Sequence, residues 1–315
     1  MFLTLIVSSV KFNVWRFLVH IHVTPKLEDA IVLLEGTSSD CLISLVPEDE
    51  LMRRAARITA GAFDFDGTLT TGSQWRAIDD LMPEVLRELG SQNRDWYWSH
   101  LHKIGNLPAS VLDPDWFHSD LHEGNQKVAE GAWIAETISL YRQAGLTRRD
   151  IEDVWLALPQ REGACDLLEL VDPRVVISFG VEQVILSWLQ NLQVVDTAVA
   201  ASRLKFNEEG VVSGCHINLV VSETKQFAAD RFRQITGVAE DQLLVVGDSV
   251  VDVHMMHPRG FNILIVPRAE ADKKLAGFRT NGIGVMWDRL TAILVSDSLQ
   301  PLVELIERAR ATHAT

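Results

Sequence analysis

The sequence predicts an α/β protein in which a doubly wound parallel sheet carries an inserted helical domain. Short apolar runs that end in Asp, Ser or Gly alternate with helical patterns, which is typical of parallel strands joined by crossover helices. A helical block separates the first such run, residues 58–65, from the next, residues 174–178. At 315 residues the chain is also longer than one compact core usually needs.

The elements of the core follow from local patterns. Pro47-Glu-Asp-Glu places acidic groups in the first turn of a helix that leads to the strand at 58–65. Asn207-Glu-Glu-Gly210 lies between alternating residues and predicts a hairpin. The remaining expected strands are 194–200, 243–246, 262–266 and 283–286, and the remaining expected core helices are 165–171, 180–188, 222–234 and 299–310.

The inserted block is expected to be helical throughout. Apolar residues at helical spacing in 77–89 predict a helix that Gly90 ends, and similar spacing recurs at 128–141 and 151–158. We therefore expect three parts. They are an N-terminal extension of uncertain structure at 1–57, a Rossmann-like catalytic core at 58–71 and 163–315, and a helical cap domain at 72–162.

Charge and cysteine content narrow the class of protein. A formal net charge of −14 argues against nucleic-acid binding, which needs a basic surface. Three widely spaced cysteines show neither a disulfide framework nor metal-ligand spacing, which favours a reducing compartment, and we expect a cytoplasmic protein. Charged residues interrupt the apolar N-terminus, whose uncharged stretch 1–10 is too short to cross a bilayer, so no membrane association is expected, a membrane-surface role being the lesser alternative.

The sharpest motif is Asp64-Phe-Asp66-Gly67-Thr68-Leu-Thr, directly after the first apolar run. In open α/β sheets, ligands bind at the carboxyl ends of the strands, where these two carboxylates are expected. Because neighbouring carboxylates repel each other, a proton or a cation must hold them together. One could attack a substrate while the other transfers protons. Gly67 lets backbone amides approach a phosphate, although a strand ending in an Asx turn explains the same letters.

A second acidic motif follows the apolar run 243–246. Asp248 stands at its tip, and Asp252 comes four residues later, about one helical turn away on the same face. Carboxylate oxygens are hard ligands and select magnesium over zinc. Gly-Asp-Ser is by itself a common turn, so this motif gains its meaning from the first one.

Two further residues complete the expected phosphate site. Lys225 follows a helix start at Ser222, so a cation and free backbone amides would meet there. Lys205 is the competing choice, but it lies on the predicted hairpin. Ser178 ends a strand, and its hydroxyl and the following amides of Phe179 and Gly180 could hold phosphate oxygens. Alone, either residue would carry no signal.

Taken in order, these motifs resemble those of the haloacid dehalogenase superfamily over residues 58–312. The resemblance implies that Asp64 is the nucleophile that forms an aspartyl-phosphate and that Asp66 is the general acid and base. It implies that Mg²⁺ is bound by Asp64, the carbonyl of Asp66 and Asp248, supported by Asp252. Ser178 and Lys225 would bind the phosphoryl group, together with Gly67 and Thr68.

Within that superfamily, the cap inserted after the first motif resembles the phosphoserine phosphatase and pyrimidine 5′-nucleotidase branch. Asp95-Trp96-Tyr is similar to an acidic residue followed by paired aromatics in the nucleotidases, which implies substrate binding by Asp95 and Trp96. Val251 stands where phosphoserine phosphatases usually have Asn, and Ser73-Gln-Trp75 where they tend to have a cap Glu. Residues 1–57 match no pattern of the family.

The function expected from these observations is Mg²⁺-dependent hydrolysis of a small phosphorylated metabolite, most simply a nucleoside 5′-monophosphate. A Trp-rich cap could stack on a flat base, although for any single tryptophan the cap core is the commoner place. The alternatives are a phosphatase of phosphoserine or another small phosphomonoester, a phosphotransferase that uses the same intermediate, and a non-enzymatic binding protein. The sequence leaves the choice between monomer and homodimer open.

Overall fold

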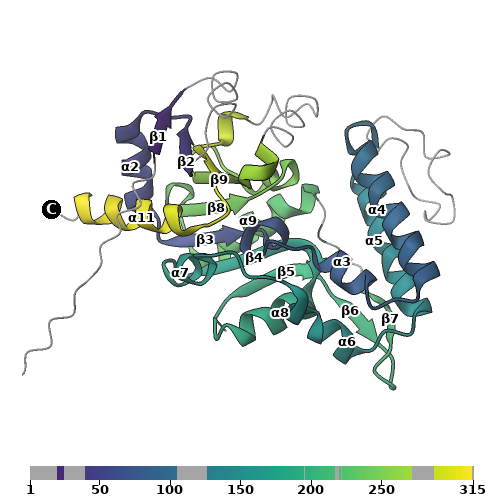
Figure 1. Cartoon of the computed structure of the whole chain (residues 1–315). Helices are drawn as coiled ribbons and strands as arrows, with labels where there is room; N and C mark the ends of the chain where they lie inside the picture. The colour runs from purple at the N-terminus through teal and green to yellow at the C-terminus, as the bar shows by residue number, and fades with distance from the viewer. Residues whose placement is uncertain are drawn as a thin grey trace, which may run out of the picture.

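An eight-stranded sheet forms the centre of the protein (Figure 1). The computed structural model describes residues 20–24, 40–104, 126–194, 196–216, 220, 222–271 and 287–313. In spatial order, the strands are β1 (His20–Val23), β2 (Cys41–Ser44), β10 (Ala292–Val295), β9 (Phe261–Val266), β8 (Leu243–Gly247), β3 (Ala60–Phe63), β4 (Arg174–Val181) and β5 (Ala198–Ser202).

Six neighbouring strands, from β10 to β5, run parallel, and only the β2–β10 pairing within the described sheet is antiparallel. β3 lies between β8 and β4, with Phe63 paired to Val246 on one side and Val176 on the other. The residues after Phe63 therefore leave the sheet between two other segments, the residues after β8 and the last residues of β4.

Helices cover both faces of the sheet, as the predicted doubly wound fold requires. Phe63, Val176 and Leu244 point into one apolar cluster with residues of α2 (Glu48–Arg57), α7 (Ala164–Glu169), α8 (Glu182–Asn191) and α11 (Gln300–His313). Ala62 and Val245 point into a second cluster with α9 (Ser222–Thr236). Burial on both faces explains why the strands read as continuous apolar runs.

Residues 41–57, which the sequence pattern separates from the core, are joined to it. β2 is buried along its whole length and pairs with β10. α2 begins at its acidic first turn, as the Pro47 pattern predicts, and packs against α11 with Leu51, Met52 and Ala55. The amphipathic pattern of α2 shows that this helix needs a partner, but the partner lies nearly 250 residues away in the sequence.

The cap is built from α3 (Gln74–Asp79), α4 (Glu84–Ile104), α5 (Gln126–Gln143) and α6 (Arg148–Asp153). α4 and α5 stand side by side away from the sheet, and the hairpin of β6 (Leu204–Phe206) and β7 (Val212–Cys215) packs on α5 (Figure 1). None of the helices in the described ranges is both long and apolar enough to cross a bilayer.

The expected end of a helix at Gly90 is wrong. The break comes earlier, at Pro83, whose carbonyl accepts from the Arg87 amide at 3.0 Å as α4 begins. Proline is favoured at a helix start and cannot donate within one. Gly90 instead lies inside α4, where an added β-carbon would lie 3.3 Å from the Asp79 carboxylate and from Met82. Its small size is used for close packing between α4 and α3.

Two other strand predictions differ from the structure. β4 does not stop at Ser178 but continues to Val181, because it pairs with β5 across an irregularity after Ile177. The strand expected at 283–286 lies outside the described residues, while β10 at 292–295 was not expected.

Candidate active site

The predicted acidic residues meet at the carboxyl ends of adjacent parallel strands. Asp64 directly follows β3, and its amide donates to the Val246 carbonyl of β8 at 2.9 Å. Asp248 directly follows β8, and Ser178 lies in β4 on the other side of β3. Three segments far apart in the sequence thus place their polar groups at one edge of the sheet, which is where open α/β sheets bind ligands.

Lys225 lies between two of the carboxylates. Its Nζ is 2.7 Å from Asp64 Oδ1 and 2.6 Å from Asp252 Oδ1, and all three side chains are buried. The ring of Phe179 packs beside it, with its centroid 5.2 Å from Nζ. The competing Lys205 is exposed on β6. The helix α9 therefore delivers one buried cation into the acidic group, as the distance of one helix and one strand between Lys225 and Asp248 predicts.

The protonation of these groups follows from burial and from their mutual charges. Burial, followed by the neighbouring Asp252 carboxylate, raises the pKa of Asp64 well above its usual range, although Lys225 opposes this. Burial alone would lower the pKa of Lys225, but Asp252 and Asp64 outweigh it and raise that pKa. Lys225 thus stays charged, and one lysine does not compensate for all the acidic groups around it. The remaining negative charge requires a proton or another cation.

Three carboxylates are arranged to hold that cation. Asp64, Asp248 and Asp252 each offer an oxygen, and these oxygens lie within 4.8 Å of one another. Asp252 is fixed in place because its Oδ2 accepts from the amides of Asp248 at 3.1 Å and Ser249 at 2.9 Å, and from the Ser249 hydroxyl at 2.8 Å. An all-oxygen donor set fits Mg²⁺. The side chain of Asp66 does not belong to this group of three, so metal binding by Asp66 stays a prediction.

The Asp66 carboxylate is held by the first cap helix instead. The Gln74 backbone amide donates to both of its oxygens at 3.2 Å, and the Gln74 side-chain amide donates to Oδ1 at 3.4 Å. Burial raises the pKa of Asp66 to about 7, even though the Gln74 backbone bond acts in the opposite direction. A carboxyl group with such a pKa exchanges a proton readily near neutrality, which suits a general acid and base.

Gln74 also connects the cap to β4. Its Oε1 accepts from the Val181 amide at 2.6 Å, and the side chain is fully buried. An added β-carbon at Gly180 would overlap the Gln74 amide. This role of Gln74 is not predicted from the sequence, because a glutamine at the start of a helix has no distinctive pattern. The only available signal was its position eight residues after Asp66.

The turn after Asp64 is fixed by a glycine and by a distant arginine. Gly67 has a φ of +77°, and a β-carbon there would overlap the Asp248 carboxylate. Thr68 donates its hydroxyl to Asp64 Oδ2 at 3.3 Å. Buried Arg161 donates to the carbonyls of Gly67 at 2.6 Å and Thr68 at 2.8 Å, and also to that of Asp297 at 3.0 Å. The sequence does not predict this role of Arg161, because the carbonyls to which it donates lie more than 90 residues away along the chain.

Ser178 is buried, and its Oγ accepts from the Gly180 amide at 3.0 Å. The Gly180 amide, expected to face substrate, is thus engaged by the serine in this arrangement. Phe179 is nearly buried as well and contacts Lys225 through its ring. The phosphate-binding roles of Ser178, Phe179 and Gly180 remain predictions.

Of the two cap residues predicted to bind substrate, Asp95 has a described side chain and Trp96 does not. Asp95 is exposed on α4, while the side chain of Trp96 lies outside the described residues, as do those of Trp98 and Trp116. Trp133 is buried in the cap, with its ring 5.3 Å from that of Trp75. Trp133 therefore packs in the core of the cap, the commoner position for a tryptophan.

The comparisons with solved structures concern the fold. The chain is similar to the crystal structure of cytosolic 5′-nucleotidase IIIB bound to cytidine, with a TM-score of 0.59, 16% identity, and coverage of 91% of this chain and 99% of that one. It is also similar to a substrate-bound phosphoserine phosphatase, with a TM-score of 0.53, 15% identity, and coverage of 78% and 97%.

A phosphoserine phosphatase in its apo form aligns with a TM-score of 0.52, 15% identity, and coverage of 78% of this chain and 98% of that one. No family model matches the chain, and no curated protein matches its sequence. The structural matches confirm the predicted fold, because the chain shares the architecture of this 5′-nucleotidase and of these phosphoserine phosphatases.

Proposed function

We propose that this protein is a Mg²⁺-dependent phosphomonoester hydrolase that works through an aspartyl-phosphate on Asp64. The observation that carries the proposal is the buried contact of Asp64 with Lys225, beside two further carboxylates within 4.8 Å. A group of this kind costs free energy in the folded state unless a proton or a cation completes it. Such strongly perturbed, clustered titratable groups are typical of active sites.

The first step of the proposed reaction is attack by an Asp64 carboxylate oxygen on phosphorus. The bond between phosphorus and the ester oxygen breaks, and Asp66 donates its proton to that leaving oxygen. A bound Mg²⁺, held by Asp64, Asp248 and Asp252, would neutralise charge on the phosphoryl group and the carboxylates. Thr68 and Lys225, which contact the two oxygens of Asp64, orient its carboxylate.

The second step releases phosphate. Asp66, now a carboxylate, accepts a proton from water while the water oxygen attacks phosphorus, and the bond to Asp64 breaks. Both steps use the same proton carrier, so the position of Asp66 matters twice. Gln74, which holds both Asp66 oxygens and belongs to the cap, links this carrier to the domain that is expected to cover the substrate.

Nucleoside 5′-monophosphates are the substrates that we propose. The 5′-nucleotidase structure, bound to cytidine, aligns over more of this chain than the phosphoserine phosphatase does. Gln74 occupies the region where phosphoserine phosphatases tend to carry a cap Glu, and this side chain is neutral, buried and bonded to Asp66. No carboxylate is thus offered there to a substrate ammonium group. We also propose that the protein is located in the cytoplasm.

A phosphate-release screen tests the proposal. Purified full-length protein is assayed with nucleoside monophosphates, phosphoserine and sugar phosphates, each with and without Mg²⁺. We expect Mg²⁺-dependent release that is fastest from a nucleoside monophosphate. A preference for phosphoserine would support the alternative substrate, and transfer of phosphate to added nucleoside would reveal a phosphotransferase. No release from any ester, in a protein that remains folded, would refute the enzymatic assignment.

A further inference from the structure

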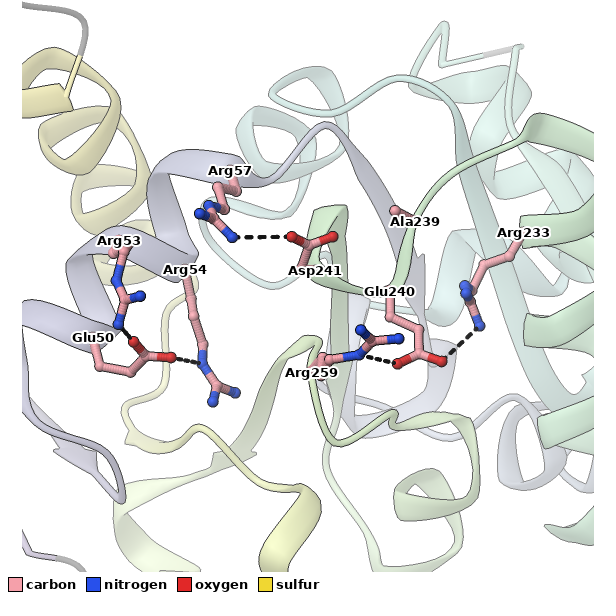
Figure 2. A pocket seen from close by; sticks show the side chains of 9 residues that line it. All are labelled: Glu50, Arg53, Arg54, Arg57, Arg233, Ala239, Glu240, Asp241 and Arg259. Atoms are coloured by element: carbon pink, nitrogen blue, oxygen red, sulfur yellow. Dashed lines mark hydrogen bonds and ion pairs between the residues drawn. The ribbon is translucent and has the colours of Figure 1, made fainter.

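A polar hollow lies at the amino ends of the parallel strands, whereas Asp64 lies at their carboxyl ends. Figure 2 shows the side chains that line this hollow. It has a volume of about 410 Å³ and is lined by α2, by the end of α9, by residues 239–241 before β8, and by Arg259 before β9. α2 and residues 239–241 precede β3 and β8, the strands that lead to Asp64 and Asp248, and Arg259 precedes β9, the parallel neighbour of β8. The hollow is therefore separated from the candidate active site by the length of a strand, roughly 15 Å for five residues.

Five arginines meet three carboxylates in this hollow. Arg53, Arg54 and Arg57 come from successive turns of α2, while Arg233 and Arg259 approach from the other side (Figure 2). Two positive charges are thus in excess in a chain whose net charge is −14. A local basic pocket on an acidic protein is a place where anions can gather.

The carboxylates are too few for the guanidinium groups, so two of them are shared. Glu50 contacts Arg53 and lies 2.6 Å from Arg54. Glu240 contacts Arg259 at 3.1 Å and Arg233 at 3.7 Å, and Arg233 also lies 3.6 Å from Asp230, which is outside the lining. A guanidinium has five N–H donors, and one shared carboxylate does not saturate two of them.

The arginines of the hollow differ in the exposed fraction of their side chains and in the number of partners that hold them. Arg54 is anchored, since its Nη1 donates to the carbonyls of Pro258 and Gly260 at 3.3 Å, and its side chain is 24% exposed. Arg57 and Arg259 are 55% and 79% exposed. Exposed arginines with one weakly held partner can turn toward a ligand at low cost, because surface ion pairs contribute little.

We propose that this hollow binds a compact polyanion that carries two or more phosphate groups. Arginine forks match phosphate oxygens in paired hydrogen bonds, and several segments of the core would be joined by one ligand. The lining has no aromatic residue, and Ala239 is its one apolar member, so a nucleobase would find no aromatic ring and little apolar surface there. Inorganic tripolyphosphate should accordingly bind about as well as ATP, and both more tightly than AMP. This inference does not rest on the proposed function.

The competing interpretation is a closed network of ion pairs that only joins α2 to the turns before β8 and β9. The two interpretations differ in what happens when a carboxylate is removed. Asp241 holds Arg57 at 3.0 Å. In a binding site, Asp241→Asn frees a guanidinium and removes a repulsive charge, so the affinity for tripolyphosphate rises. In a closed network, the same change produces no binding and removes a weak ion pair.

The experiment is isothermal titration of the full-length protein with tripolyphosphate, ATP and AMP, at low ionic strength and with EDTA present. EDTA removes divalent ions, so an anion bridged by a metal at the candidate active site cannot produce the signal, and its loss in the arginine variants locates the binding to the hollow. We expect saturable binding of tripolyphosphate that Arg57→Gln with Arg259→Gln weakens at least about tenfold. Asp241→Asn should strengthen it severalfold.

The matched control is Arg149→Gln, which removes an exposed arginine paired with Asp153 at 3.4 Å on the cap surface. This control should leave the affinity unchanged. The inference is overturned if wild-type protein shows no saturable binding, or if the control variant weakens binding as much as the paired Arg57 and Arg259 changes. Binding of ATP but not of tripolyphosphate would also overturn it, because the ligand would then be recognised through its nucleoside.

Discussion

The two ends of the parallel strands carry opposite and differently buried charge. At the carboxyl ends, Asp64, Asp252 and Lys225 are buried, with Asp66 and Asp248 close by. At the amino ends, five arginines exceed three carboxylates, and several of them are largely exposed. Two like charges 4 Å apart repel by about 4 kcal/mol at an effective dielectric of 20, and solvent and salt weaken such terms at a surface.

The burial of the charged groups at each end decides whether a ligand is needed to compensate for excess charge. Buried carboxylates are only weakly screened, so the group at the carboxyl ends needs its lysine and, in addition, a proton or a cation to be stable. Exposed arginines at the amino end are stable without a ligand, and any ligand there is an addition. Changes at the first end should therefore alter chemistry, whereas changes at the second should alter binding alone.

Replacing the nucleophile should have the largest effect. Asp64→Asn retains the shape of the side chain but removes the attacking carboxylate, so Mg²⁺-dependent hydrolysis of an aryl phosphate should fall to background. The matched control is Asp241→Asn, the same chemical change at the other end of the strands, which should retain at least half of the activity. Full turnover by a folded Asp64→Asn protein would contradict the proposed mechanism.

Removing the metal should come next. With EDTA, hydrolysis should fall to background and return on addition of Mg²⁺. Because Mg²⁺ binds only the folded cluster, a concentration of 100 times Kd should also stabilise the fold by about 2.7 kcal/mol. Differential scanning fluorimetry measures that shift, and Asp248→Asn should reduce it. A melting temperature that ignores Mg²⁺ in the wild-type protein would count against the three-carboxylate site.

Replacing the general acid should have an effect that depends on the leaving group. Asp66→Asn cannot donate a proton, so kcat on an alkyl phosphate should fall by about 10²–10⁴. A nitrophenyl ester, whose leaving group needs no proton, should lose less in the step that forms the intermediate. Single-turnover measurements of that step compare the two esters. Equal losses on both would show that Asp66 has another role.

A smaller and more selective effect is expected at Gln74. Gln74→Leu removes the side-chain bonds to Asp66 and Val181 while the backbone bond to Asp66 remains. We expect kcat on alkyl phosphates to fall by about tenfold, with affinity for Mg²⁺ unchanged, because a misplaced acid loses part of its 10²–10⁴-fold contribution. Ser73→Ala, one residue earlier, is the control. A loss shared equally by all esters and by metal binding would indicate a purely structural role.

The smallest effect belongs to the amino end of the strands. Arg57→Gln removes an exposed ion pair with Asp241, and exposed pairs contribute at most about 1 kcal/mol. Urea unfolding should show a change within that limit, and hydrolysis should be unaffected. A loss of several kcal/mol would mean that this region is a buried structural network, and the contrast between the two ends would then fail.

The parts of the fold that follow from local periodicity could be predicted from the sequence. The strands that lead to Asp64 and Asp248 are continuous apolar runs, and only burial on both faces of a sheet explains such runs. Gly90 suggests the end of a helix because a glycine inside a helix is usually unfavourable. Here a β-carbon at this position would lie only 3.3 Å from Asp79 and Met82, so close packing favours glycine. That reason lies in tertiary packing and has no local signature.

The candidate site divides in the same way. Asp64 and Asp248 could be identified because each follows an apolar run and carries a distinctive turn sequence. Arg161 and Gln74 could not, since their roles depend on carbonyls, amides and carboxylates from other segments. Lys225 could be preferred to Lys205 only on topological grounds, and the contacts at 2.6 and 2.7 Å distinguish them directly.

The contact between Gln74 and Gly180 constrains how this chain can diverge. A β-carbon at position 180 would occupy the space of the Gln74 amide, so neither position can change freely. A relative with alanine at 180 must carry a shorter residue at 74, and it must then hold Asp66 by other means. The two positions are thus expected to covary among homologues, although 106 positions separate them along the chain.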